Sequence, residues 1–248
     1  MIIVMFSLFG LIFGSFLNVL LWRLPEGQGI GGRSRCRSCG HILAWYDLVP
    51  VLSFIFLKAR CRHCQGPIHI RYPLIELAAA LSLGAYIAVV QPALTLQTVF
   101  MAAGILILVS LLFFDLFYMI LPDALTLPAI TVFAVLDAFR PDAGFYFLAG
   151  LLLALFFAIL YVVSRGTQLG FGDVKLALLV GLMLGYPLGF ISVVTGIWLG
   201  ALTGIVLLIL GWKTRKDPLP LGAFLAFTAL ISIIFSHEIL SRAGHLFF

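Results

Sequence analysis

The succession of long apolar stretches is the feature that most constrains what this chain can fold into. Hydrophobic residues make up 63% of its 248 residues and charged residues only 10%, whereas a soluble globular domain carries roughly 25% charged residues. A bilayer core about 30 Å thick needs roughly 20 apolar residues per helix, and backbone polar groups in hydrocarbon must be satisfied within the helix. The sequence therefore predicts an all-α polytopic membrane protein with about eight transmembrane helices.

The apolar ranges 1–22, 73–91, 97–114, 123–138, 144–163, 172–186, 188–211 and 220–237 are each expected to form one transmembrane helix. The first range could be mistaken for a secretory signal. It lacks a basic start and a small-residue cleavage site, so we expect it to be retained. The chain thus divides into a first transmembrane helix at 1–22, a soluble module at 23–72, and a membrane core of about seven helices at 73–248.

Lysine and arginine residues are distributed unevenly between the predicted loops. Positively charged loops near the ends of transmembrane helices stay in the cytoplasm. With the N-terminus outside, the cytoplasmic loops receive most of the basic residues, including Arg215 and Lys216, and the outer side receives only Arg140 and Arg242. We interpret the net charge of +5 as a topology signal rather than as a sign of nucleic-acid binding. The basic module at 23–72 could also contact anionic lipid.

All four cysteines of the chain lie in this module, as two CxxC pairs. Cys36 pairs with Cys39, and Cys61 pairs with Cys64. This spacing is typical of a zinc ribbon, in which four thiolates enclose a tetrahedral ion and leave no open position for a substrate. The predicted zinc is therefore structural, and it would stabilise a module that has too few apolar residues for a core of its own.

Other interpretations of the cysteines stay open at this point. A reducing cytosol disfavours two disulfides, and the paired spacing disfavours four unrelated thiols. Four cysteines can also ligate an iron–sulfur cluster, although paired CxxC knuckles fit a ribbon better.

Acidic residues beside the membrane are the main candidates for chemistry. The chain has only ten Asp and Glu residues, and an ionisable group in hydrocarbon costs roughly 2.5–3.5 kcal/mol and usually marks function. Asp115 ends the third predicted helix and Asp173 begins the sixth, so we expect both at the cytoplasmic membrane edge. Two carboxyl groups in a poorly solvated site share a proton, and such a pair can activate water to attack a peptide bond.

Two glycines precede the second aspartate in the short motif Gly170-Phe171-Gly172-Asp173. A glycine lets the backbone bend, or approach a substrate closely, where a side chain would obstruct it. The motif alone is weak, because Asp173 could cap its helix after a glycine turn or pair with Lys175. A second aspartate at the same membrane edge favours the catalytic interpretation.

Three other polar residues near the membrane have structural interpretations. We expect Asp123 to cap the helix that it begins, so it ranks below Asp115 as a catalytic residue. Glu76 lies early in the second predicted helix, where an arginine on the cytoplasmic side could pair with it. Asn18 lies inside the first helix, where its amide could hydrogen-bond across helices.

A series of short motifs follows one order along most of the chain, from Gly14 to about Gly185. The motifs are Phe13 to Val19 with Arg23-Leu24-Pro25, both CxxC pairs with Asp47 to Ser53 between them, Arg71 to Glu76, Asp115 with Leu121-Pro122-Asp123 and Thr126, and Gly170 to Asp173. This order resembles that of the type IV prepilin peptidases, which are bifunctional leader peptidases and N-methyltransferases of pilus and type II secretion systems.

The resemblance implies an aspartyl protease of the intramembrane GxGD type. Its catalytic residues would be Asp115 and Asp173, with Gly170, Gly172 and Asp123 as supporting motif residues. It also implies cleavage after a glycine at the end of the short basic leader of a prepilin or pseudopilin, at the cytoplasmic face of the bacterial inner membrane.

The resemblance implies a second activity as well, because many relatives methylate the new N-terminus with S-adenosylmethionine. Candidates for that activity are the cysteine module and the polar residues Asn18, Arg71 and Glu76. Relatives often have a proline inside the first CxxC pair, where this chain has Arg37-Ser38. That departure leaves metal binding intact and says nothing in favour of methylation.

Three rival functions explain only part of the sequence. A transporter would account for buried carboxylates, but the inverted repeats with broken helices that mark many transporters are not evident. A membrane scaffold with a zinc-ribbon docking module would account for the cysteines but not for two aspartates at one membrane edge. A methyltransferase without protease activity would not need the aspartates, and the sequence offers no soluble Gly-rich cofactor-binding fold.

Overall fold

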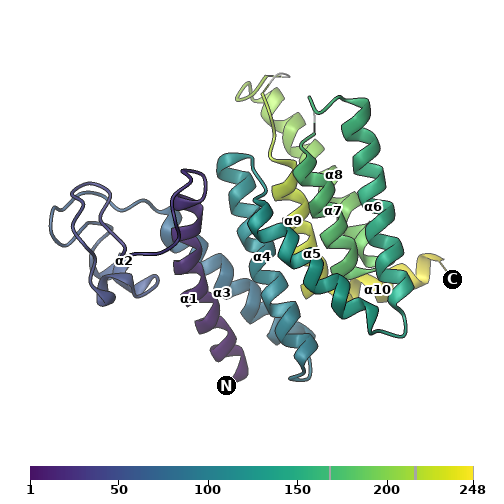
Figure 1. Ribbon diagram of the computed structural model, residues 1–248, viewed down its shortest axis with the longest axis horizontal. Coiled ribbons are helices and arrows are strands. Elements are labelled where there is room, and N and C mark those ends of the chain that lie inside the picture. Colours follow the sequence, from purple (N-terminus) through teal and green to yellow (C-terminus); the bar gives the residue numbers. More distant parts are fainter. Residues whose placement is uncertain (168, 215–216, 248) are drawn as a thin grey trace. The chain divides into compact units, whose positions relative to one another are not determined.

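A computed structural model describes residues 1–167, 169–214 and 217–247, with side chains up to residue 242. Arg215 and Lys216, which the charge distribution assigned to the cytoplasmic side, lie outside the described residues. Within these ranges the regular elements are all helices, and the β-type pairing is limited to two isolated bridges. The chain divides into two compact units, Met1–Gln91 and Pro92–Phe248 (Figure 1).

The first unit is built on two helices, α1 (Ile2–Arg23) and α3 (Arg71–Val90), which pack side by side. A Cβ atom added to Gly10 would lie 2.6 Å from the carbonyl oxygen of Ala79, and one added to Gly14 would lie 2.6 Å from Cα of Glu76. Glycine is therefore required for the two backbones to approach this closely. Because the contacts run in opposite directions along the chain, the helices are antiparallel, and the end of α1 meets the start of α3.

The segment between these helices forms a small module with little regular structure. It contains a 3-10 helix, η1 (Trp45–Leu48), a short helix, α2 (Leu52–Phe56), and the two β-bridges, Arg35 with Ile42 and Arg60 with Pro67. Each bridge closes a loop around one CxxC pair. The module therefore has two similar knuckles, as a zinc ribbon requires.

The second unit is a bundle of helices around the short helix α7 (Phe171–Leu184). The other helices are α4 (Leu96–Tyr118), α5 (Asp123–Ala138), α6 (Ala143–Val163), α8 (Leu188–Ile209), α9 (Leu221–Ile234) and α10 (Ser236–Phe247). Helix α7 packs against α5, α6, α8 and α9, which explains why its residues are apolar on nearly all sides. A Cβ atom added to Gly181 would lie 2.4 Å from Cα of Gly150 in α6, so these two helices pack backbone to backbone. Asp173 stands in the first turn of this central helix.

Fewer of the described helices reach membrane-spanning length than the sequence predicts. Every predicted transmembrane range holds an α-helix. Among the described residues, however, only 5 helices are long and apolar enough to cross a membrane, or 6 if α9 and the adjoining α10, bent by 85°, count as one span. The predicted count of eight transmembrane helices is therefore not confirmed. The all-helical membrane fold with a cysteine cluster is confirmed.

Candidate active site and metal centre

Asp115 lies in the last turn of α4 and is 6% exposed. Its Oδ2 atom accepts a hydrogen bond from the backbone N–H of Ala223, at 2.7 Å, and the N–H of Gly222 also donates to the carboxylate. Both donors belong to the first turn of α9. Backbone N–H groups at the start of a helix have no intrahelical partner, so they are well suited to hold a carboxylate in one orientation.

Asp173 is the third residue of α7 and is 8% exposed. Its Oδ2 atom accepts a hydrogen bond from the backbone N–H of Gly170, at 3.3 Å. Gly170 has an extended backbone, and the helix begins directly after it. The predicted glycine turn before the helix is therefore present, and Oδ2 of Asp173 helps to close this turn. The Oδ1 atom of Asp173 is left available for other contacts.

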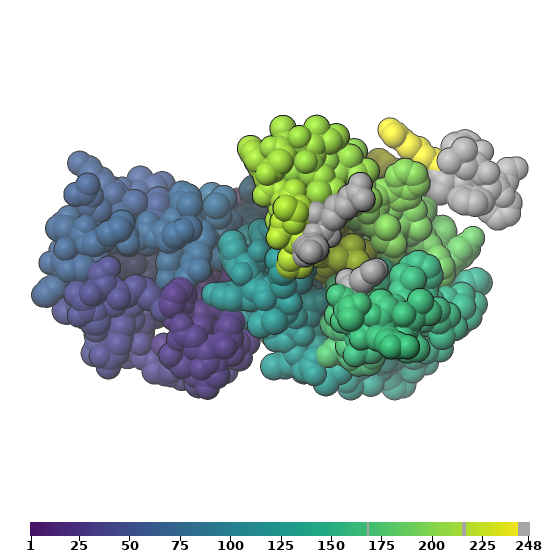
Figure 2. All heavy atoms as spheres, turned by 90° about the horizontal axis from the view of Figure 1, so that it is seen from above, coloured from purple at the N-terminus to yellow at the C-terminus, as the bar shows by residue number. Residues whose placement is uncertain are grey.

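The two carboxyl groups approach each other at one end of the second unit. They are close enough for the charge of Asp115 to act on Asp173. Leu121, in the connection between α4 and α5, contacts the backbone at both Gly172 and Gly222. Figure 2 looks onto this end of the unit and shows the α4–α5 connection (teal) beside the residues that precede α9 (yellow-green). Three distant segments of the chain thus surround the aspartates.

Gly222 and Ala223 were not among the residues singled out from the sequence, and Leu121 was named only as part of the motif Leu121-Pro122-Asp123, with no role of its own. A signal for the first two existed in Pro218-Leu219-Pro220, because two prolines before an apolar run typically mark the start of a helix. The free N–H groups of such a helix start can then serve a carboxylate. The motif that contains Leu121 does not indicate a role for its side chain, since a leucine before a proline is common in any helix connection.

Two expectations about Asp123 and its surroundings are corrected by the structure. Pro122 occupies the N-cap position and no side chain caps the helix, so Asp123 is the first residue of α5 and not its cap. Its carboxylate forms an ion pair with Lys175. The suggested pairing of Lys175 with Asp173 is therefore wrong, because α5 packs directly against α7 and brings Asp123 to the lysine.

The four cysteines gather into one cluster in the module of the first unit. All four Sγ atoms lie within 4.8 Å of one another, and those of Cys36 and Cys64 are 3.8 Å apart. The sulfurs are free and not joined as disulfides. Four thiolates at about 2.3 Å from a zinc ion stand roughly 3.8 Å apart in a tetrahedron. The cluster can therefore hold a metal ion, and its dimensions suit zinc.

Backbone hydrogen bonds shape both knuckles in the same way. The N–H of Cys36 donates to the carbonyl of His41, and the N–H of Gly40 donates to the carbonyl of Cys36. In the second knuckle, Cys61 donates to Gly66 and accepts from Gln65. This repeated pattern places the two members of each pair on one side of a tight loop, ready to ligate a shared ion.

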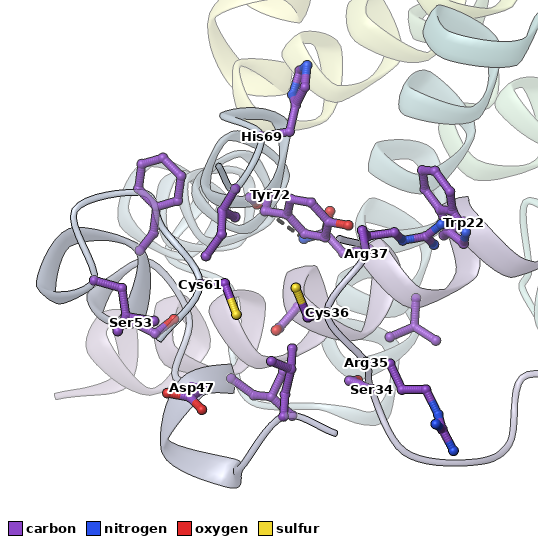
Figure 3. Close-up of a pocket in the computed structure, with 18 of the residues that line it drawn as sticks. Trp22, Ser34, Arg35, Cys36, Arg37, Asp47, Ser53, Cys61, His69 and Tyr72 are labelled. Atoms are coloured by element: carbon purple, nitrogen blue, oxygen red, sulfur yellow. Dashed lines mark hydrogen bonds between the residues drawn. The ribbon is translucent and has the colours of Figure 1, made fainter. Parts of the chain in front are cut away.

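A cavity of about 610 Å³ lies beside the cysteine cluster, between the module and the facing ends of α1 and α3. Asn18, Arg71 and Glu76, which were proposed from the sequence, all line it. Figure 3 shows the sulfurs of Cys36 and Cys61 turned toward each other among the residues that line the cavity. The cavity is thus large enough for a small organic ligand, which typically occupies 300–1,000 Å³.

Aromatic and cationic side chains form one rim of this cavity. The guanidinium group of Arg37 lies over the ring of Trp22 (Figure 3), and that of Arg71 also lies over this ring, at 4.7 Å from its centre. A guanidinium over an indole ring is held by the ring quadrupole and keeps its hydrogen-bond donors free at the edge. The rim therefore offers positive charge for an anionic group of a ligand.

Polar residues of the same two helices, α1 and α3, also line the cavity. Asn18 donates to the carbonyls of Gly14 and Tyr72, at 3.2 Å and 3.1 Å, so it links α1 to α3 as predicted. Glu76 was expected to pair with an arginine, and that expectation is wrong. Among the described residues its partners are the backbone N–H of Val51, at 2.8 Å, and the hydroxyl of Ser15. Val51 has a φ of 61°, which is rare for a β-branched residue, so this bond holds a strained turn of the module.

Comparison with known proteins relates both units to one family. The bacterial peptidase A24 N-terminal domain matches residues 8–90, and the type IV leader peptidase family matches residues 102–209. A prepilin leader peptidase/N-methyltransferase of Aeromonas hydrophila is 33% identical over 94% of this chain and 90% of its own length. The chain belongs to this family. Relatives of the same name from Burkholderia pseudomallei and Legionella pneumophila are 35% and 32% identical, covering 91% and 95% of this chain and 83% and 92% of their own lengths.

Family membership decides between the functions that the sequence left open. The matching peptidase family and the relatives named prepilin leader peptidase/N-methyltransferase favour a peptidase with methyltransferase activity, and the apolar helices suit a membrane protein, so the transporter and scaffold interpretations are not favoured. No solved structure matches this chain.

Proposed function

We propose that this protein is an inner-membrane aspartyl endopeptidase that removes the short basic leader from type IV prepilins or pseudopilins by cutting after a glycine. The catalytic residues are Asp115 and Asp173. The observation that carries the proposal is the meeting of these two buried carboxyl groups, one from the last turn of α4 and one from the first turn of α7. The curated relatives are named for this activity.

The geometry suits activation of water between the carboxyl groups. The Oδ2 atom of each aspartate is held by a backbone N–H, from Ala223 or Gly170, so each Oδ1 atom can face the water. The ionised carboxylate accepts a proton from the water as the water oxygen attacks the scissile carbonyl carbon. The protonated partner donates its proton to the carbonyl oxygen. When the tetrahedral intermediate collapses, the C–N bond breaks and the leaving amine takes the proton that the first carboxylate received from the water. The second carboxylate takes a proton back from a hydroxyl of the intermediate as the new carboxyl group forms, so the dyad returns to its starting state.

The proposed orientation places the N-terminus outside and both the dyad and the cysteine module on the cytoplasmic side. It rests on the excess of lysine and arginine in the loops of that side. A membrane-impermeant thiol reagent tests this placement, because Cys39 and Cys64 are exposed. In spheroplasts with the zinc removed, they should react only after the membrane is opened. Labelling of intact spheroplasts would show that the orientation is the reverse of the one proposed.

The cysteine cluster is proposed to bind one structural zinc ion through Cys36, Cys39, Cys61 and Cys64. Its support is the near-tetrahedral spacing of the sulfurs. A closed set of four thiolates leaves no position for a substrate, so the ion stabilises the module and the wall of the cavity beside it.

The cavity in the first unit is proposed to bind S-adenosylmethionine for methylation of the new N-terminus. When bound, the cofactor supplies an electrophilic methyl group. Arg71 and Arg37 can pair with its carboxylate, while Glu76 supplies negative charge for its sulfonium, and Asn18 offers its free amide oxygen. The presence of both charge signs in one cavity fits a zwitterionic ligand.

Exposed basic residues of the module are proposed to approach anionic lipid headgroups. Arg33 and Lys58 are candidates because neither is needed for the cavity wall. Each contact would contribute about 1 kcal/mol near an anionic surface. Replacing both by glutamine should reduce the difference in activity between anionic and neutral nanodiscs, and an unchanged difference would exclude the contact.

Cleavage of a prepilin by the purified protein tests the main proposal. A detergent-solubilised prepilin should yield a shortened product whose mass places the cut after the glycine of the leader. An intact substrate, or a product cut elsewhere, would contradict the proposed function.

A further inference from the structure

Leu121 separates the two glycines that flank the catalytic aspartates. A Cβ atom added to Gly172 would lie 3.0 Å from Cβ of Leu121, and one added to Gly222 would lie 3.0 Å from its Cδ1 atom. These separations mean that the leucine side chain already touches both glycine backbones. It therefore fills the space that side chains at these positions would otherwise occupy.

Both glycines are immediate neighbours of the dyad. Gly172 precedes Asp173 in the chain, and a Cβ atom on Gly222 would lie 3.1 Å from Oδ2 of Asp115. The side chain of Leu121 thus forms a wall directly beside the place where the carboxyl groups face a substrate. It is only half-buried, so one side of it remains available for contact.

The connection that carries Leu121 is fastened at both ends. At its start, Met119 has a φ of 53° and its N–H donates to the carbonyl of Asp115 at 2.9 Å, which ends helix α4. At its other end, Asp123 is tied to Lys175 in α7 by an ion pair. The lysine side chain is 16% exposed and that of Asp123 is 61% exposed, so the lysine end of the pair is shielded from solvent while the carboxylate end is open to it. Leu121 is therefore held in a fixed place relative to Asp173.

The chemistry of peptide cleavage determines which substrate side chain meets this wall. The carbonyl carbon that is attacked must lie between the two carboxyl groups. The residue before the cut carries its side chain on the carbon bonded to that carbonyl. Its first side-chain atom must therefore stand beside the dyad. There, the absence of side chains at Gly172 and Gly222 leaves room for the substrate backbone, and the side chain of Leu121 limits the space for that first side-chain atom.

We infer that Leu121 imposes the requirement for glycine at the residue before the cut, by occupying the space that a Cβ atom of any other residue would need. The Asp123–Lys175 ion pair is the positioning element that keeps the leucine there. This inference rests on the proposed function, since it specifies the substrate preference of that same site.

The test compares two prepilins that differ only in having glycine or alanine before the cut. The measured quantity is the ratio of their kcat/KM values. In the Leu121→Ala variant the preference for glycine should fall roughly tenfold or more, which is what one methyl group is worth in a restricted pocket. Leu127→Ala is the matched control, because Leu127 is 48% exposed in α5 and outside the site, and it should keep the native ratio.

A second pair of variants keeps the test decisive if Leu121→Ala fails to fold. Asp123→Asn breaks the ion pair, and it should also relax the preference for glycine, whereas Asp123→Glu keeps the charge and should preserve the preference. A merely structural role of the pair would lower both kcat/KM values together and leave their ratio unchanged.

The outcomes separate this inference from the proposed function. If the native protein cleaves the glycine substrate while Leu121→Ala and Asp123→Asn both retain the native ratio, the inference is overturned and the peptidase assignment stands. If the native protein cleaves neither prepilin, the proposed function itself fails.

Discussion

The carboxylate of Asp115 accepts a hydrogen bond from the backbone N–H of Ala223, 2.7 Å away and 108 positions further along the chain. This bond joins the end of α4 to the start of α9. The free N–H groups of one helix start thus orient the proposed catalytic carboxyl group, which would otherwise rotate freely. The segment before α9 is therefore as much a part of the site as the glycine motif before α7.

Replacing Gly222 by alanine tests the importance of this contact. The added methyl group would lie 3.1 Å from Oδ2 of Asp115 and 3.0 Å from Cδ1 of Leu121, and both are tighter than ordinary packing. Overpacking of this kind costs typically 1–3 kcal/mol. We expect kcat/KM for prepilin cleavage to fall at least about tenfold, measured with purified protein.

Gly144→Ala is the control for that variant, because a Cβ atom there meets nothing within 4 Å. It should cleave prepilin at the native rate. Native activity of Gly222→Ala would show that the backbone of α9 does not restrict Asp115.

Metal analysis tests the cysteine cluster. The purified protein should contain about one zinc ion per chain, since four thiolates complete a tetrahedral site. Cys36→Ser should lose most of this zinc, and Ser38→Ala, a change in the same exposed loop, should retain it. Iron in place of zinc, or no metal with all four thiols reduced, would exclude the zinc assignment.

Glu76→Gln tests the proposed second activity. The amide keeps an acceptor for the N–H of Val51 but removes the negative charge from the cavity wall. Methylation of the cleaved product, measured by mass spectrometry, should fall at least about tenfold, while cleavage continues because Asp115 and Asp173 belong to the other unit.

The matched control for this variant is Glu238→Gln, which changes an exposed carboxylate of the second unit, outside the cavity. Equal losses of methylation and cleavage in Glu76→Gln would indicate general damage to the protein. Full methylation would remove Glu76 from the cofactor site.

Local sequence patterns predicted the helices and the cysteine module well, for physical reasons. Each apolar range must form a helix in a membrane, and two CxxC pairs leave few alternatives to a shared centre. The pairing of Asp115 with Asp173 followed from the topology, since both fall at the same ends of alternating helices.

Contacts between distant segments were the part that sequence reasoning missed. The donor to Asp115 is a backbone N–H, which no side chain reveals. The partner of Lys175 depends on which helix packs against α7, and the neighbouring Asp173 was an equally plausible choice until that packing was known. Leu121 belongs to a motif of the resemblance, but the role proposed for its side chain comes from the two glycines that it touches.

Replacing each aspartate by asparagine is the most direct test of the catalytic assignment. An amide can neither accept the proton of the attacking water nor share the proton of the dyad. Asp115→Asn and Asp173→Asn should each lower prepilin cleavage by about a thousandfold or more while the protein remains in the membrane, and Asp123→Asn should have a much smaller effect on a glycine substrate. Substantial cleavage by either of the first two variants, or loss of cleavage in Asp123→Asn alone, would contradict the account.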